Sequence, residues 1–232
     1  MPAFLKDISP FYGTGENNSD GLSLEEFLKD YDPYKYKTPS CTADAVIFSC
    51  KGEPKPDVPG MKLLMVKRSN HPSIGFWALP GGFINLDEDL DDTAKRELKE
   101  ETGVEDVVME QIATYGNYDR DPRARVITTA YMALVDAEKL TIQAGDDAAD
   151  AVWCDITLRL QHSKTVGAVH TNQYLLQVKN TEKELDTEAI VEQAVREGLI
   201  REQHFTVKEK GMIAVDHAAI IVQALTILGD RH

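Results

Sequence analysis

The sequence predicts a mixed α/β domain in which strands lie on both sides of an acidic helix. Three observations support this prediction. Segments 41–50, 62–67 and 126–135 are rich in the apolar and β-branched residues that favour strands. Segment 91–102 has helical periodicity with acidic residues in its first turn, and segment 217–228 is a strongly apolar helix. The 232 residues suffice for one sizeable domain, or for one domain with a large insertion.

The first 39 residues are expected to form an arm. Gly, Asn, Ser and Pro are frequent in residues 1–21, and this composition favours irregular structure. Ser23 and Glu26 have the spacing of a capping box, which predicts a short helix that ends near Tyr31. Residues 31–39 should run extended, because a residue that precedes proline avoids the helical conformation.

Residues 40–156 are expected to form the core of the domain. In addition to the segments above, strands are predicted at 107–115 and 151–156, and a turn-rich loop is predicted at 51–60. Gly103 follows the acidic helix directly, in the position of a carboxyl-terminal cap.

Residues 157–213 are predicted to form an inserted α+β segment of unknown role. Segment 173–178 is interpreted as a strand. Segment 186–197 is interpreted as an amphipathic helix, with apolar residues at Ala189, Ile190, Val191, Ala194 and Val195. Residues 214–232 then complete the domain, with Asp216 as the expected N-cap of the final helix.

The composition indicates a folded protein of the cytoplasm. Hydrophobic residues make up 42% and charged residues 28% of the chain, which argues against disorder. No apolar run approaches the roughly 18–20 residues that a membrane-spanning helix needs, and the start of the sequence lacks the pattern of a signal peptide. Cys41, Cys50 and Cys154 match no metal-ligand spacing, so we expect reduced and mostly buried thiols.

The net charge of −14 restricts the kinds of partner. Surfaces that bind duplex DNA are usually basic, so no nucleic-acid partner is expected. An acidic protein that handles an anionic ligand commonly does so through a divalent metal ion held by carboxylates. The alternative is that the acidity serves only solubility.

The acidic helix has the pattern of a metal site. Eight of the seventeen residues from 85 to 101 are Asp or Glu. At about 100° per residue, Glu97, Glu100 and Glu101 share one edge, and Ala94 and Leu98 form the neighbouring apolar stripe. Like charges at these spacings repel, so a buried edge needs a counter-charge. Mg²⁺ or Mn²⁺ provides it and leaves positions for phosphate oxygens; a solvated acidic face is the alternative.

The loop before this helix completes a family motif. Pro80, Gly81 and Gly82 let the backbone approach a ligand closely. From Gly82 to Val104 the sequence fits the pattern G-x5-E-x7-R-E-U-x-E-E-x-G-U at every fixed position. This pattern is the Nudix box, and the chain resembles the Nudix hydrolases over about residues 40–156 and in its final helix.

The resemblance implies a Nudix α/β/α sandwich with a mixed sheet, and metal-assisted attack of water on a diphosphate. The implied metal ligands are the carbonyl of Gly81 and the carboxylates of Glu97, Glu100 and Glu101. Glu88 and Arg96 are the implied partners that orient this cluster. Glu97 is one candidate for the catalytic base, and the alternative is an acidic residue of a later loop: Asp146, Asp147 or Asp150.

Residues 118–125 resemble a segment of the ADP-ribose pyrophosphatase branch of this family, including the proline at position 122. A surface turn with mixed charges is the alternative interpretation. Arginines at 120, 123 and 125 would suit a terminal ribose phosphate, and aromatic rings, Tyr115 among them, would stack an adenine. The candidate substrate-binding residues are Trp77, Gly82, Tyr118, Arg123 and Arg125.

The favoured hypothesis is a Mg²⁺-dependent hydrolase that converts ADP-ribose to AMP and ribose 5-phosphate. Related repressors of NAD metabolism sense ADP-ribose with a Nudix domain and append a winged helix after a segment like 214–220. The sequence lacks that winged helix and has an intact box, which favours the enzyme over the sensor. Another nucleotide sugar or a damaged nucleotide is a further alternative. Residues 157–213 would cap the site or form a homodimer interface, and the final helix fits either role or plain core packing.

Overall fold

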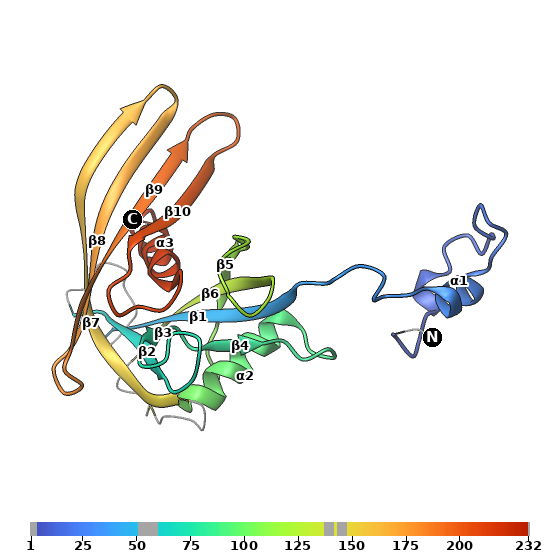
Figure 1. Cartoon of the computed structure of the whole chain (residues 1–232), viewed down its shortest axis with the longest axis horizontal. Helices are drawn as coiled ribbons and strands as arrows, with labels where there is room; N and C mark the ends of the chain where they lie inside the picture. Colours follow the sequence, from blue (N-terminus) through green and yellow to red (C-terminus); the bar gives the residue numbers. More distant parts are fainter. Residues whose placement is uncertain (1–3, 51–59, 137–141, 143–147, 232) are drawn as a thin grey trace. The chain divides into compact units, whose positions relative to one another are not determined.

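The computed structural model describes residues 4–50, 60–136, 142 and 148–231 of the chain (Figure 1). The chain divides into two compact units, Met1–Thr38 and Pro39–His232. Residues 157–213 belong to the same unit as the core segments that precede them.

The amino-terminal unit contains a short 3-10 helix, η1 (Ser9–Phe11), and one α-helix, α1 (Leu24–Asp30). The capping box is confirmed. The Ser23 hydroxyl accepts from the Glu26 amide at 3.3 Å, and the Glu26 carboxylate accepts from the Ser23 amide at 2.9 Å. None of the described residues of this unit is buried, so local hydrogen bonds rather than a core hold α1 together.

The second unit is built on one mixed sheet. Among the described residues its strands are β1 (Ser40–Cys50), β2 (Lys62–Arg68), β3 (Trp77–Ala78), β4 (Gly81–Phe83), β5 (Glu110–Tyr115), β6 (Val126–Asp136), β7 (Ala148–Val166), β8 (Val169–Asn180), β9 (Leu185–Arg196) and β10 (Glu202–Glu209). The strand order is β10-β9-β8-β7-β2-β1-β6-β5, with β3 paired to β2 and β4 paired to β1. Strands β1 and β6 are parallel, and the other paired strands are antiparallel.

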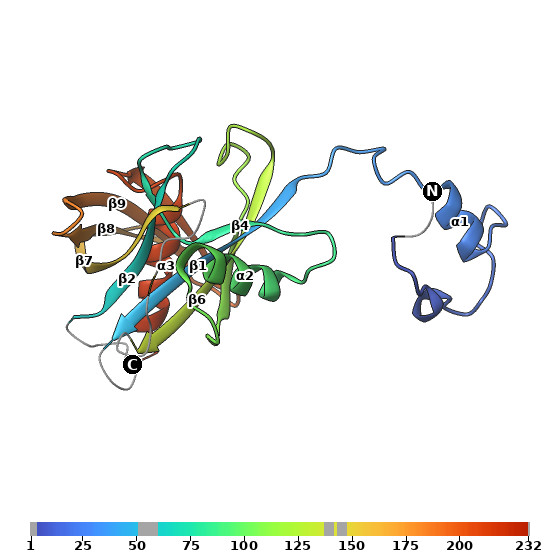
Figure 2. The ribbon, with the colours of Figure 1, turned by 90° about the horizontal axis from the view of Figure 1, so that it is seen from below.

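The two longer helices cover opposite faces of this sheet. Helix α2 (Leu90–Thr102) packs Leu98 against Ile47 of β1, and helix α3 (His217–Gly229) packs Ile220 in the cluster that contains Phe48. Because successive side chains of a strand point to opposite faces, β1 can serve both helices. Strands β7 to β10 curve around α3 (Figures 1 and 2). These features confirm the predicted α/β/α arrangement with a mixed sheet.

The helix predicted at 91–102 is confirmed as α2. Gly103 has φ 74°, a left-handed conformation that favours glycine, and its amide donates to the Lys99 carbonyl at 2.8 Å. The predicted strands at 41–50, 62–67 and 126–135 are confirmed as well. The sequence therefore defines both ends of the acidic helix and the strands that surround it.

The helix predicted at 186–197 is wrong, because these residues form strand β9. The spacing of its apolar residues fits a helical stripe, but the burial of this segment alternates with a period of two. Strands β8 and β10 pair with β9 on both sides and satisfy its backbone groups. All of residues 157–213 are described. The segment expected as α+β therefore contains strands and no helix. The buried side chains of β9 are Leu185, Thr187, Ala189, Val191, Gln193 and Val195.

Helix α3 is fixed at its start by contacts from distant segments. Asp216 occupies the expected N-cap position but makes no side-chain cap bond; its carboxylate instead accepts two hydrogen bonds from Arg120, both at 2.9 Å. The Tyr115 hydroxyl donates to Gln223 at 2.6 Å in the middle of the helix.

Within the described part of the chain, no helix has both the length and the apolar character needed to cross a bilayer.

Two of the cysteine side chains are described. Cys154 is buried in the core below α3, and burial raises the pKa of its thiol to about 12. Cys41 is partly buried near the start of β1. The side chain of Cys50 lies outside the described residues.

Candidate active site

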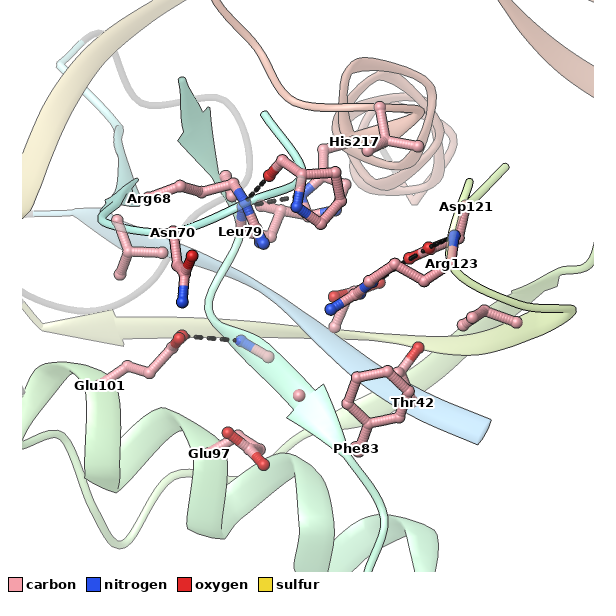
Figure 3. Close-up of a pocket in the computed structure, with 18 of the residues that line it drawn as sticks. Thr42, Arg68, Asn70, Leu79, Phe83, Glu97, Glu101, Asp121, Arg123 and His217 are labelled. Atoms are coloured by element: carbon pink, nitrogen blue, oxygen red, sulfur yellow. Dashed lines mark hydrogen bonds and ion pairs between the residues drawn. The ribbon is translucent and has the colours of Figure 1, made fainter. Parts of the chain in front are cut away.

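A cavity of about 450 Å³ opens beside the Nudix-box segment. Helix α2, strands β1 and β4, the loop after β2, the loop before β6 and the start of α3 all contribute to its lining. Figure 3 shows Glu97 and Glu101 on α2, Asp121 and Arg123 on the loop before β6, and His217 at the start of α3. The cavity therefore brings together segments that are far apart in the sequence.

Gly81 and Gly82 let the α2 carboxylates approach the backbone. The Gly81 amide donates to the Glu101 carboxylate at 2.9 Å. A Cβ atom on Gly82 would lie 2.4 Å from the carboxyl carbon of Glu97, a separation too short for any side chain to fit without displacing that carboxylate. The expected close approach at this glycine pair is therefore present, and at Gly82 the nearest neighbour is the Glu97 carboxylate on the acidic edge of the helix.

The two carboxylates that face this backbone are held in an environment that opposes their charge. Burial raises the pKa of Glu101 to about 7, the Gly81 amide lowers it, and the charges of Glu97 and Asp44 raise it further. Burial also raises the pKa of Glu97, against the opposing effect of Arg96. A divalent cation would relieve this cost, so the electrostatics of the site fit a metal ion.

Arg96 is the main counter-charge of the Nudix-box residues. Its guanidinium donates to Glu88 at 2.9 Å, to Glu97 at 2.7 Å and to Glu100 at 2.9 Å, and it also reaches the Phe83 carbonyl at 3.0 Å. The hydrogen bonds from Arg96 are the main reason why the pKa of Glu88 is lowered to about 2. Arg96 and Glu88 thus connect α2 with the loop before it, as expected for partners that orient the cluster.

The predicted metal ligands are not equally placed. Glu97 and Glu101 line the cavity, whereas the Glu100 side chain is 57% exposed and is bonded to Arg96. Among the described residues, no three His, Cys, Asp or Glu side chains lie close enough together to hold a metal ion by themselves. A pair of carboxylates still suits Mg²⁺ or Mn²⁺, because such ions commonly retain waters and substrate phosphate oxygens as ligands. The donor chemistry at Glu97 and Glu101 therefore fits the ion.

Two of the three candidate bases of the later loop, Asp146 and Asp147, lie outside the described residues. Asp150 is described, at the start of β7, and its carboxylate forms an ion pair with Lys183 at 2.6 Å. Asp150 is not among the residues that line the cavity. Of the two candidate bases that the structure describes, Glu97 lines the cavity and Asp150 does not.

The arginines of the loop before β6 have different positions. Arg123 lines the cavity, forms a paired contact with Asp121 and lies 5.3 Å from the centre of the Phe83 ring. Arg125 instead donates to the carbonyls of Gly116 and Asn117 at 2.6 and 3.0 Å. Arg123 is therefore available to a ligand, whereas Arg125 holds the loop in shape.

Neither of the two aromatic residues predicted to bind substrate, Trp77 and Tyr118, lines the cavity. Trp77 is 4% exposed, belongs to the core cluster that also contains residues of α3, and is not among the residues that line the cavity. Its backbone pairs with the segment before α3, at Met212 and Ala214. Tyr118 is 83% exposed and does not line the cavity either. The sequence cannot distinguish a ring in the core from a ring over a ligand.

Several cavity residues were missed by the sequence interpretation or given too little weight. Asp44, Asp216 and His217 line or border the cavity, and Arg120, noted only as one arginine of its loop, is buried among them. Asp44 gave one usable signal, because a carboxylate interrupts the apolar strand at 41–50. Arg120, Asp216 and His217 gave no such signal, because Arg120 is far from the other two in the sequence and only the fold brings them together.

The family comparison agrees with this arrangement. The family model described as NUDIX domain matches residues 39–169, which is more than half of the chain. The chain belongs to the Nudix family. Its Nudix box is therefore the segment from Gly82 to Val104, and the cavity contains the inward-facing glutamates of that box.

Two relatives of known description share this domain. Over 116 residues the chain is 40% identical to the ADPR responsive transcriptional repressor NtrR of Acinetobacter baylyi, which covers 49% of this chain and 44% of the repressor. Over 156 residues it is 38% identical to the ADP-ribose pyrophosphatase of Methanocaldococcus jannaschii, which covers 66% of this chain and 84% of that enzyme. The match thus spans less than half of the repressor's length.

Solved structures with the same Nudix fold include a MutT/nudix family protein from Enterococcus faecalis, with 29% identity and a TM-score of 0.62 over 90% of this chain and 70% of that one. The NUDIX domain of Shewanella oneidensis NrtR, solved with ADP ribose, has 28% identity and a TM-score of 0.58 over 89% of this chain and 99% of that one. Both likenesses confirm the mixed α/β Nudix fold.

Proposed function

We propose that this Nudix protein is a metal-dependent pyrophosphohydrolase that cleaves ADP-ribose to AMP and ribose 5-phosphate. The observation that carries the proposal is the packing of Glu97 and Glu101 against the Gly81–Gly82 backbone inside the cavity. Burial opposes the charge of both carboxylates, which is the environment that a divalent cation would stabilise.

Mg²⁺ or Mn²⁺, when bound, would neutralise the diphosphate and lower the pKa of the attacking water. Glu97 and Glu101 would hold the ion, and the Gly81 carbonyl is a further candidate ligand. Arg96 would keep Glu97 and Glu100 in place through its hydrogen bonds to both. Water would add to one phosphorus atom while the bond from that phosphorus to the bridging oxygen breaks, and the two phosphate monoesters leave as products.

The choice of ADP-ribose has two kinds of support. The 38% identical relative is described as an ADP-ribose pyrophosphatase, and the NUDIX domain of Shewanella oneidensis NrtR was solved with ADP ribose. The cavity also places Arg68 and Arg123 around the site, which suits a ligand with two phosphates. Arg123, with 48% of its side chain exposed, is more accessible than Arg120, with 7% exposed.

A substrate panel tests the proposal. ADP-ribose, a nucleotide sugar with another base, a dinucleoside diphosphate and an oxidised nucleoside triphosphate would be compared with Mg²⁺ and with Mn²⁺, and products would be identified by chromatography. We expect ADP-ribose to have a kcat/KM at least tenfold above the others, with AMP and ribose 5-phosphate formed in equal amounts. A higher value for another compound would replace the substrate and keep the reaction class.

The identity of the general base is tested separately. Glu97→Gln and Asp147→Asn would each be compared with the native protein over a range of pH. The base should be the residue whose substitution removes the acidic limb of the pH profile, while loss of a metal ligand should instead raise the Mg²⁺ concentration needed for half-maximal turnover. Asp150→Asn is the matched control, because that carboxylate already forms an ion pair with Lys183.

An ADP-ribose sensor with weak catalysis is the second candidate, because the chain is 40% identical to a repressor described as ADPR responsive. The two candidates differ in turnover rather than in ligand. A sensor should bind ADP-ribose with micromolar affinity in the presence of Mg²⁺ and leave it intact over hours. Release of AMP within minutes at the same protein concentration would exclude that role.

A further inference from the structure

A second group of polar side chains lines the same cavity. Asp44 is 6% exposed, His217 is 7% exposed and the Arg120 side chain is 7% exposed. None of the three lies in the Nudix box, and none has a part in the hydrolysis proposed above. Burying polar groups at the wall of a cavity is costly unless each one has a partner, so these three need an explanation.

Asp44 presents an unused acceptor. Its Oδ2 atom accepts from the Thr128 hydroxyl at 2.7 Å and lies 3.7 Å from the Arg120 guanidinium. No described residue donates to Oδ1. Yet within the described chain every fully buried side-chain oxygen or nitrogen has a hydrogen-bond partner. Oδ1 must therefore be accessible from the cavity that Asp44 lines.

His217 presents an unused donor. Its Nδ1 atom accepts the Leu79 amide at 2.8 Å, so the proton of the neutral ring is on Nε2. No described residue is hydrogen-bonded to Nε2, so this atom, like Asp44 Oδ1, must be accessible from the cavity. The bond to Leu79, shown in Figure 3, fixes both the position of the ring and its tautomer.

Arg120 adds further donors and the local charge. Two of its nitrogens are bonded to Asp216 at 2.9 Å each, and its Nη1 atom has no partner among the described residues. Arg120 brings one positive charge, and Asp44 and Asp216 bring two negative charges, so the group as a whole is unfavourable for an anion. The ligand that fits is a neutral group with both donors and acceptors.

We propose that Asp44, Arg120 and His217 bind the vicinal hydroxyls of a ribose that is attached to the diphosphate. Each hydroxyl can donate to the Asp44 carboxylate and accept from the His217 or Arg120 N–H groups. A carboxylate that accepts from a ribose hydroxyl is also the arrangement that many dinucleotide sites use.

The position of Asp44 favours the sugar over the adenine edge, which also has donors and acceptors. Asp44 pairs with Gly81 across β1 and β4, and its charge acts on Glu101. The site therefore adjoins the place where the diphosphate would be bound, and the atoms next to a diphosphate belong to the sugar. This step rests on the proposed function, which places the diphosphate beside Glu97 and Glu101.

A metal ion is the third candidate for this position. The Arg120 cation lies 3.7 Å from Asp44, and the donors of Arg120 and His217 face the same space. Positive charge and N–H groups repel a cation, so the surroundings of Asp44 favour hydroxyls.

Ligand binding tests the proposal without requiring turnover. Isothermal titration in the presence of Mg²⁺ would compare AMP with 2′-deoxy-AMP, and ribose 5-phosphate with 2-deoxyribose 5-phosphate. The native protein should bind at least one ribose compound tenfold or more tightly than its deoxy counterpart. His217→Asn retains an acceptor for the Leu79 amide and removes the Nε2 donor, and Asp44→Asn removes the charged acceptor. Both variants should reduce that ratio to less than threefold.

The controls separate this role from the alternatives. His204→Asn, on the exposed face of β10, should retain the native ratio, because 70% of that side chain is exposed. His217→Gln can restore an N–H near the Nε2 position and should recover part of the discrimination. If Asp44→Asn does not fold, the two His217 variants decide the question alone.

Four results would overturn the proposal. The first is that the native protein binds both members of each pair with equal affinity, and the second is that the variants retain the full preference for the ribose compounds. The third is that the variants lose selectivity for AMP over IMP but keep the ribose preference. The fourth is that Asp44→Asn lowers the affinity for Mn²⁺ tenfold or more. The third result would assign the group to the base, and the fourth would assign Asp44 to the metal. Absence of ADP-ribose hydrolysis in the native protein would overturn the proposed function, while the ribose preference would still be measurable.

Discussion

Two arginine-centred clusters border the same cavity, and they differ in how they are built. Arg96 contacts Glu88, eight residues before it, and Glu97, the residue after it, and its side chain is 24% exposed. Arg120 contacts Asp216, which is 96 residues away, and its side chain is 7% exposed. The first cluster follows from the spacing of residues on one helix and its preceding loop. The second exists only where β1, the loop before β6 and the start of α3 meet.

This difference separates the expected roles of the two clusters. Water reaches the Arg96 cluster, so its charges are partly screened and its glutamates remain available to a metal ion. The Arg120 cluster is closed to water on most sides, so its ion pair should matter more for holding α3 in place. We therefore expect substitutions in the first cluster to affect turnover more than stability, and the opposite in the second.

The largest effect is expected for Glu101→Gln. The substitution preserves the shape of the side chain and removes a carboxylate that we assign to the metal, so kcat should fall about a thousandfold, or about 4 kcal/mol in activation free energy. Turnover of ADP-ribose under saturating Mg²⁺ measures it. Near-native turnover in a folded variant would remove Glu101 from the metal site.

Arg120→Met tests the second cluster. Removing the guanidinium leaves the buried carboxylate of Asp44 and the partly buried carboxylate of Asp216 without a counter-charge, so the free energy of unfolding should fall by about 3 kcal/mol. Urea denaturation measures this change. Arg96→Met is the matched comparison and should lower stability by about 1 kcal/mol, because the Arg96 side chain is 24% exposed and its partner Glu100 is 57% exposed. Equal losses in the two variants would contradict the distinction between the clusters.

The pH dependence of the metal-free protein comes next in size. The pKa of Glu101 is about 7 in the folded protein and about 4.5 in an unfolded chain. Between these values the folded state binds more protons, so the free energy of unfolding falls as the pH rises. The contribution should be roughly 2–3 kcal/mol between pH 5 and pH 8. Denaturation in the presence of a chelator would measure it, and Glu101→Gln should show a correspondingly weaker slope.

The smallest effect is expected for Arg123→Ala. Arg123 lines the cavity but is half exposed and already paired with Asp121, so kcat/KM for ADP-ribose should fall about fivefold, or about 1 kcal/mol. A dinucleoside diphosphate should be affected less. Arg125→Ala is the contrasting variant. Arg125 holds the loop through the Gly116 and Asn117 carbonyls, so its loss should lower the melting temperature. An unchanged selectivity in Arg123→Ala would leave that residue as part of a surface turn.

Several elements of the fold were predictable because each has a local signal. The capping box at Ser23, the left-handed Gly103 and the apolar strand at 126–136 are all determined by neighbours in the sequence. Segment 186–197 lacked such a signal, since its apolar spacing fits a helix and a strand about equally well. Pairing with β8 and β10 decided for the strand, and this pairing depends on partners at other positions in the chain.

The sequence by itself determined the Nudix box, the helix that carries it and the pair of glycines against which Glu97 and Glu101 pack. These features depend on spacings of a few residues, and helical geometry converts such spacings directly into proximity. Only the tertiary structure decided that Trp77 is a core residue, that Arg125 supports its own loop, and that Asp44, Arg120 and His217 meet at one wall of the cavity. Contacts between distant positions are set by the packing of the whole sheet against its helices, and no local pattern of residues encodes that packing.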